Sequence, residues 1–161
     1  MARPRTGDAE LLLRLYELRR DPEMRRAREF MISEFNVTSW DEIRPHYLTG
    51  DELDRHFRMT ISYWDMVAAF VNRGLIDEEL FFDTHGEDIV LWKKIAPIIE
   101  GARAHIRPTY AWNLERLAKR HQAWRDATYP TAAAVIEAGS SPRKGGDEGK
   151  RARKKEKKRP R

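Results

Sequence analysis

Arg116 and His121 have the side chains best suited to chemistry in this 161-residue chain, and they lie five positions apart in a stretch with helical periodicity. An arginine can stabilise the charge that develops on a phosphate during cleavage, and a histidine can transfer a proton. The pair could therefore combine charge stabilisation with proton transfer. Five residues turn about 140° around an ideal helix, so the two side chains diverge unless the helix is distorted or acts across a dimer.

The spacing of Arg116 and His121 resembles that of the HEPN family, all-helical ribonucleases in which an Arg and a His near one helix end act on the RNA phosphate. This resemblance implies a ribonuclease with these two residues in its catalytic site. However, His121 shares an apolar helical face with Leu117 and Trp124, and the family usually has a polar residue at the position of Leu117. The same residues therefore also predict a packed, hydrogen-bonded histidine with no catalytic role.

Two groups of residues have the types that bind metal ions. The first group spans six positions and consists of Asp83, His85, Glu87 and Asp88. These side chains could hold a hard cation, but His followed by Gly is typical of a helix end, and acids favour the first turn of the next helix. Glu52 and His56 are one helical turn apart, as in zinc sites, yet no third ligand follows at a related spacing. We therefore expect helix punctuation at the first group, an exposed helical pair at the second, and no metal or cofactor.

The strongest functional signal is the tail from Lys150 to Arg161, which lies in a basic segment that begins at Gly139. The segment from Gly139 contains 11 Lys and Arg residues and three Asp and Glu residues, a net charge of +8, whereas residues 1–138 have a net charge of −3. Nine of the last 12 residues are cationic, which favours salt-dependent binding to the phosphates of DNA or RNA. No aromatic residue is present to stack on bases, so the contact should be sequence-tolerant. The predicted polyanion-binding residues are Arg143, Lys144, Lys150, Arg151, Arg153, Lys154, Lys155, Lys157, Lys158, Arg159 and Arg161.

Other roles for this basic segment remain open. Its composition could serve only to keep a disordered terminus soluble. It could also meet an acidic membrane surface, although no apolar anchor or amphipathic helix accompanies it. It resembles a nuclear-import tract as well.

Composition excludes several classes of protein. The chain has no cysteine, so disulfides and thiolate metal sites are ruled out, and a reducing compartment is compatible with this. It has no uncharged apolar run long enough for a membrane span and no signal-peptide pattern at its start, so we expect a cytoplasmic protein without a membrane partner. It also lacks a glycine-rich phosphate loop, a nucleophile elbow and a Cys/His nucleophile pair, which argues against a conventional enzyme.

Helices must position all these residues, because apolar periods of three and four residues dominate and no strand pattern competes with them. Asp8 is expected to cap a first helix with Leu12, Leu15 and Leu18 on its apolar face. Asp21-Pro22 restarts the helix, with an apolar face that ends at Phe35. Ser39 and Glu42 form a capping-box pattern ahead of a short helical turn.

The central helix is expected at about residues 51–72 and is apolar around most of its girth. Such a helix is usually the buried centre of a domain or part of a subunit interface. Trp64, Met66 and Phe70 could therefore supply a surface for homodimerisation. The helix should end where Gly74 can adopt the left-handed conformation.

Further helices follow. Asp77 caps a short one, residues 87–105 form the next with a kink at Pro97, and a turn at 107–109 leads into another that ends near Asp126. Residues 131–138 could add a final helical piece. Asp65, Glu115 and Arg103 lie close to apolar faces, so an ion pair between Arg103 and one of the two acids is expected.

The segment from Trp64 to Arg120 carries a family resemblance. Its features are the phrase from Gly74 to Leu80 (GLIDEEL), Trp92, the phrase Pro97-Ile98-Ile99, Arg103, and the phrase from Leu114 to Ala118 (LERLA). In these features the segment resembles an uncharacterised bacterial family, domain of unknown function 4760. The resemblance implies an all-helical domain and brings no activity with it.

The sequence thus predicts an all-α protein, a compact bundle of five or six helices with a disordered basic C-terminal tail. The expected divisions are a flexible N-terminus at 1–7, a helical domain at 8–138 and the Lys/Arg-rich tail at 139–161. The predicted function is a non-catalytic interaction module whose tail contacts nucleic acid or another polyanion. The alternative is the HEPN-like ribonuclease that uses Arg116 and His121.

Overall fold

The computed structural model describes residues 5–130, so the predictions for 1–4, for the helical piece at 131–138 and for the basic segment at 139–161 lie outside the described residues. Within that part every regular element is helical, which confirms the all-α bundle. The elements are α1 (Thr6–Arg19), α2 (Pro22–Glu29), the π-helical segment η1 (Phe30–Glu34), α3 (Trp40–Ile43), α4 (Glu52–Asn72), α5 (Glu78–Thr84), α6 (Glu87–Ile95), the 3-10 segment η2 (Ala96–Ile98), α7 (Ile99–His105) and α8 (Trp112–Thr128).

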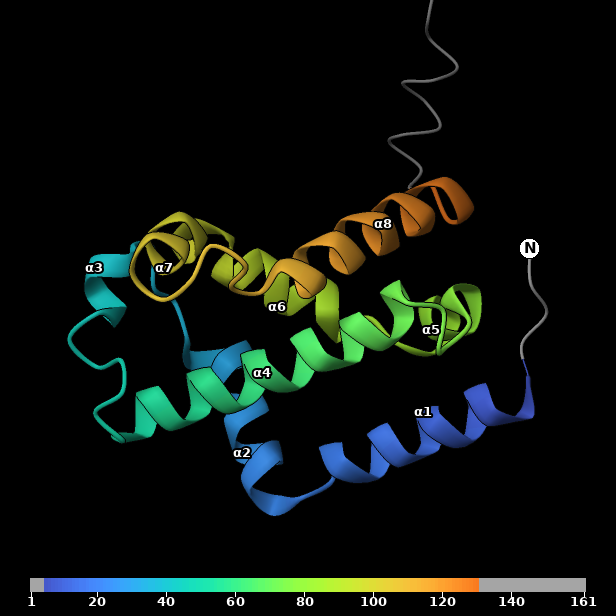
Figure 1. The fold of residues 1–161 in the computed structure, drawn as a ribbon, viewed down its shortest axis with the longest axis horizontal. Helices are drawn as coiled ribbons and strands as arrows, with labels where there is room; N and C mark the ends of the chain where they lie inside the picture. Colours follow the sequence, from blue (N-terminus) through green and yellow to red (C-terminus); the bar gives the residue numbers. More distant parts are fainter. Residues whose placement is uncertain (1–4, 131–161) are drawn as a thin grey trace, which may run out of the picture. The chain divides into compact units, whose positions relative to one another are not determined.

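Helix α4 is the centre of the bundle, as its apolar girth predicts. It runs between α1 and α2 on one side and α6 and α8 on the other (Figure 1). The carboxylate of Asp51 caps its start by accepting a hydrogen bond from the Asp54 amide at 2.8 Å. At its end Gly74 has φ +69°, and the Leu75 amide donates to the Phe70 carbonyl at 2.9 Å. This Schellman geometry confirms the predicted stop.

The first helix starts earlier than expected. Helix α1 begins at Thr6, so the prediction of a flexible terminus is wrong for Thr6 and Gly7. Asp8 lies inside the first turn and its carboxylate accepts from the backbone amide of Arg5 at 2.9 Å, which extends the helix backwards. Leu18, expected on the buried face, is 54% exposed. The predicted restart is confirmed, because Asp21 accepts from the Glu23 and Met24 amides at the start of α2.

Pro97 interrupts the predicted helix at 87–105. It has no amide hydrogen to donate, and the chain passes through η2 between α6 and α7. The kink is therefore confirmed. Beyond it, Gly101 of α7 lies directly against the Trp40 side chain of α3, and a Cβ at position 101 would be 2.2 Å from the Trp40 Cβ. Only glycine permits this close approach.

Helix α8 receives its N-terminal cap from α4. The residue before the helix is Ala111, which has φ +51° and no side chain able to cap. Asp65 of α4 takes this role, since its carboxylate accepts from the amides of Asn113 at 2.9 Å and Leu114 at 3.0 Å. The start of α8 is thus fixed by tertiary contact, and it lies three residues beyond the turn from which the sequence predicts it.

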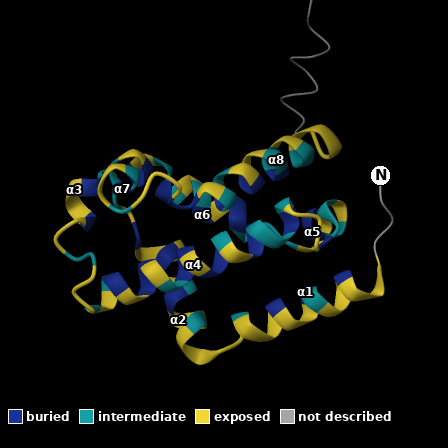
Figure 2. Ribbon diagram, in the orientation of Figure 1, coloured by how far each residue is buried: buried dark blue, intermediate teal, exposed yellow. Residues whose placement is uncertain are grey.

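The core lies on the inner faces of the helices around α4, where buried residues gather (Figure 2). Trp64 is fully buried there, so its expected place in a self-association surface is wrong. Met66 is 39% exposed and Phe70 is half-buried, and homodimerisation through these two residues stays a prediction.

Among the described helices, none combines the length and hydrophobicity needed to cross a bilayer.

Candidate functional site

Two of the candidate residues named from the sequence, Glu87 and Asp88, lie side by side in the first turn of α6. Gly86 precedes them as the N-cap, so both carboxylates occupy the helix end that favours negative charge. Stabilising the start of α6 is therefore one part of their role, as the sequence predicts. Each carboxylate also binds side chains of other helices, and the sequence did not predict these contacts.

His121 of α8 binds Asp88. Its Nδ1 lies 2.9 Å from Oδ2 and 3.1 Å from Oδ1 of the carboxylate. The imidazole stacks on Phe82 with ring centroids 4.3 Å apart and an interplanar angle of 8°. The His121 and Asp88 side chains are 2% and 0% exposed. The interpretation of His121 as a packed, hydrogen-bonded histidine is confirmed.

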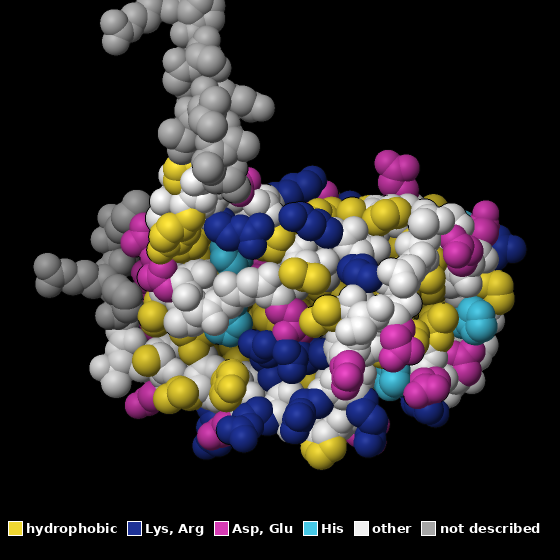
Figure 3. Space-filling model, turned by 180° about the vertical axis from the view of Figure 1, so that it is seen from behind, with side chains coloured by type: hydrophobic (Ala, Val, Ile, Leu, Met, Phe, Trp, Pro, Cys, Tyr) yellow, Lys and Arg dark blue, Asp and Glu magenta, His cyan; other side chains and the backbone are white. Residues whose placement is uncertain are grey.

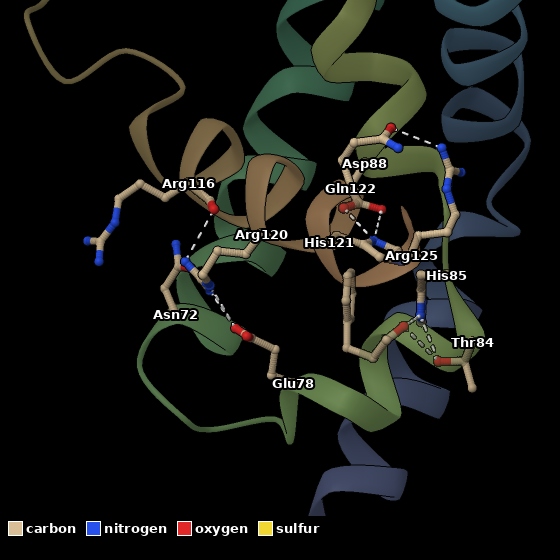
Figure 4. Close-up of polar contacts among 11 residues, drawn as sticks. Asn72, Glu78, Thr84, His85, Asp88, Arg116, Arg120, His121, Gln122 and Arg125 are labelled. Carbon is tan, nitrogen blue, oxygen red and sulfur yellow. Dashed lines mark hydrogen bonds and ion pairs between the residues drawn. The ribbon is translucent and has the colours of Figure 1, made fainter. Parts of the chain in front are cut away.

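The structure does not bring Arg116 to His121. Arg116 is exposed on α8 and its guanidinium points away from the imidazole, while Arg120 faces the neighbouring elements (Figure 4). Arg120 donates from Nε to Glu78 at 3.0 Å and from Nη2 to Oδ1 of Asn72 at 2.8 Å. The divergence expected for five residues on a regular helix is what α8 shows, because the helix is undistorted from Trp112 to Thr128.

Glu87 is the centre of a second, larger ionic cluster. It accepts from Arg19 at 2.8 Å, from Nε of Arg28 at 2.6 Å and from the indole of Trp64 at 3.1 Å, and the Arg28 Nη2 also donates to it. Burial acts to raise the pKa of Glu87, but the Arg28 hydrogen bond and the charges of Arg19 and Arg28 outweigh it, so the pKa lies below its ordinary value. The cluster joins α1, α2, α4 and α6.

His85 lies between these two groups. Its ring stacks on Phe81 at 4.3 Å with an interplanar angle of 4°, and its Nδ1 is 2.9 Å from the Thr84 hydroxyl. Burial, followed by the positive charge of Arg19, lowers the pKa of His85. The ring is therefore held in its neutral form at a more acidic pH than a free histidine.

Nothing in the described part of the chain gathers three or more His, Asp and Glu residues in a geometry that could hold a metal ion. Glu52 is exposed as predicted, but the prediction of an exposed pair is wrong for His56, which is 8% exposed and packs near Phe30 at 5.2 Å. This aromatic neighbour, at the start of η1, explains its burial.

The predicted ion pair of Arg103 is confirmed with Glu115, at 2.6 Å. Asp65 takes no part in it because its oxygens bind the α8 amides. No local signal identifies the partners of Glu87, since Arg19 and Arg28 belong to helices more than 50 residues earlier.

Comparison with curated proteins and with solved structures finds no significant match. A family model does match, over residues 5–121, and its description is domain of unknown function (DUF4760). This range contains all the helices from α1 to α7 and most of α8, so the match includes Glu87, Asp88 and His121. The chain therefore belongs to the DUF4760 family.

Proposed function

We propose that this protein is a non-catalytic helical interaction module, cytoplasmic and of bacterial type, whose basic C-terminal segment contacts nucleic acid or another polyanion. One observation carries the proposal: residues 139–161 have a net charge of +8, and residues 1–138 have a net charge of −3. Phosphate contacts by such a segment release counterions and depend steeply on salt.

The ionic contacts of the helical body support the assignment of polyanion binding to the basic segment. Its buried carboxylates bind groups of the body itself, as Glu87 does with Arg19 and Arg28. On the face shown in Figure 3, Lys and Arg side chains are interspersed with Asp, Glu and apolar ones, and several of the cations gather along the lower edge. The segment from Gly139 has only three acids for 11 cations, and this excess of eight positive charges is what a polyanion would neutralise.

The test is a fluorescence-anisotropy titration of labelled RNA and duplex DNA with the full-length protein. A variant with the nine cations of residues 150–161 replaced by glutamine removes the charge, and a variant with these 12 residues in scrambled order preserves it. We expect the scrambled variant to bind like wild type and the neutralised variant to lose affinity at least about tenfold. Between about 50 and 200 mM salt, wild-type binding should weaken by about three orders of magnitude or more.

Equal binding by the neutralised and wild-type proteins would contradict the proposal. The same samples, run on a denaturing gel, report on the ribonuclease alternative. RNA cleavage that persists in the neutralised variant and disappears in Arg116→Ala would favour that alternative over the interaction module. Arg116 is exposed, so its replacement leaves the fold intact.

A further inference from the structure

A cavity of about 490 Å³ opens between α4 and the connection from α7 to α8. Its volume falls in the range of small-molecule sites, about 300–1,000 Å³. The residues that decide its chemistry are Tyr47, Arg55, Arg58, Arg107 and Tyr110. Its lining residues among 5–130 are different from those of the ionic clusters of α6.

Three guanidinium groups line this cavity, and the two carboxylates beside them are already engaged. Asp54 accepts from the amides of Leu48 and Gly50, each at 3.0 Å, and Asp65 caps α8. Only Arg58 approaches a carboxylate here, Asp54, at 3.5 Å.

The other two arginines form no ion pair with a carboxylate among residues 5–130. Arg55 donates to the neutral carbonyl of Gly50 at 3.1 Å. Arg107 lies over the Tyr110 ring at 5.9 Å. With the carboxylates of Asp54 and Asp65 counted against the three guanidinium groups, the lining has a net charge of +1, and a phosphate monoester of about −1.5 to −2 at neutral pH would complement it. Guanidinium groups also match phosphate oxygens in bidentate geometry.

The remaining walls are apolar and aromatic. Tyr47 is half-buried and packs edge-on against Trp40, and Met59 and Ile106 complete the surface near it. Tyr110 is 8% exposed, and burial raises the pKa of its hydroxyl, which keeps its proton and can donate a hydrogen bond. Aromatic walls beside arginines suit a flat ring that carries a phosphate.

The backbone around the cavity is strained. Leu48, with φ +66°, and Ala111, with φ +51°, are the two non-glycine residues with positive φ in the described part of the chain. Ala111 lines the cavity, and Leu48 lies between the lining residues Tyr47 and Gly50. Such conformations are costly for residues with a Cβ, and they concentrate at ligand sites.

From these observations we propose that the cavity binds a nucleoside phosphate, with its phosphate on Arg55, Arg58 and Arg107 and its base against Tyr47. The shared chemistry is a nucleotide, and its source is either a free mononucleotide or one unit of an RNA strand. The site belongs to the helical body, so it does not depend on the basic segment or on the proposed function of that segment.

The test is isothermal titration of the full-length protein with adenosine monophosphate and uridine monophosphate, and with adenosine and inorganic phosphate as partial ligands. We expect the nucleotides to bind at least about tenfold more tightly than either partial ligand, because both halves of the site then contribute. The double variant Arg55→Gln/Arg107→Gln should weaken nucleotide binding at least about tenfold. Arg73→Gln, an exposed arginine at the opposite end of α4, is the matched control and should bind like wild type.

A second arm identifies the source of the nucleotide. It measures RNA binding with the same double variant, built on the background in which the cations of residues 150–161 are neutralised. Weakened binding of mononucleotides assigns the site to a free nucleotide, and weakened binding of RNA alone assigns it to a strand. If the double variant binds both probes like its parent, or if neither probe binds the parent, the proposal is wrong. If mononucleotides still bind after the cations of residues 150–161 are neutralised, the cavity binds them without the basic segment. Failure of the cavity proposal can then be told apart from failure of the proposed function.

Discussion

The imidazole Nδ1 of His121 lies 2.9 Å from the Asp88 carboxylate, and this contact joins α8 to α6 across a sequence separation of 33 residues. Neither group reaches solvent, since the side chains are 2% and 0% exposed. A buried carboxylate is stable only when its oxygens are bound. The pair is therefore a structural tie between two helices.

Removing one member of this pair should destabilise the fold. We expect His121→Ala to reduce the free energy of unfolding by about 3 kcal/mol, because the Asp88 carboxylate is left buried and unpaired. Urea denaturation followed by circular dichroism measures the loss. His105→Ala is the control, since His105 is exposed and its ring nitrogen hydrogen-bonds the Gly101 carbonyl of its own helix. A loss below about 0.5 kcal/mol in His121→Ala, the range of surface substitutions, would refute the tie.

Glu87 should govern acid stability. Its pKa in the folded protein is below the ordinary 4.5, so the unfolded chain takes up the proton first as pH falls. The stability that Glu87 contributes is complete above pH 4.5 and is lost as the pH falls through the pKa of the folded protein. We expect Glu87→Gln to cost about 2–3 kcal/mol at pH 7 and the difference from wild type to shrink below pH 4.5. Urea midpoints across this pH range measure it, and exposed Glu10→Gln should show no such trend.

His85 should act in a higher pH range. Because its pKa is lowered by burial and by Arg19, the unfolded chain binds a proton that the folded protein resists. The resulting stability is present above the ordinary value of 6.5 and is lost as pH falls from there through the folded pKa. We expect His85→Phe, which keeps the stack on Phe81, to make the free energy of unfolding less dependent on pH in this window. An NMR titration that places the pKa of His85 at or above 6.5 would contradict this account.

Gly101 should not tolerate a methyl group. Alanine is the better helix former by about 1 kcal/mol, but a Cβ at position 101 would meet the Trp40 Cβ at 2.2 Å. We therefore expect Gly101→Ala to lower the free energy of unfolding by about 1–3 kcal/mol. Gly7→Ala in α1, where a Cβ meets nothing within 4 Å, should be neutral or stabilising. Thermal melts of the two variants compare the effects, and equal melting temperatures would show that Trp40 can move.

The sequence predicts those features that depend on neighbouring residues. The helix starts at Asp21-Pro22 and near residue 51 and the stop at Gly74 use side-chain or backbone bonds within a few positions, and each is found where the pattern indicates it. The start of α8 is different, because Asp65 supplies its cap from 48 residues away. A cap donated by another helix leaves no signal in the local sequence.

The same distinction applies to the candidate site. The apolar series on α8 correctly predicts that His121 is packed, whereas its partner Asp88 is not identifiable from position alone. Adjacent carboxylates at a helix start are typical of punctuation, and nothing nearby reveals that Glu87 and Asp88 bind different helices. The cavity between α4 and α8 also escapes prediction, because its arginines come from two distant segments.

The position of Glu87 in the chain has a consequence for biosynthesis. Arg19 and Arg28 are made 68 and 59 residues before the carboxylate that they share. A nascent chain that ends within α4 therefore carries both arginines without this partner, whatever helical structure α1 and α2 have formed. The N-terminal quarter of the protein can complete its ionic contacts only after the start of α6 has left the ribosome, so folding of this domain cannot finish in the order of synthesis.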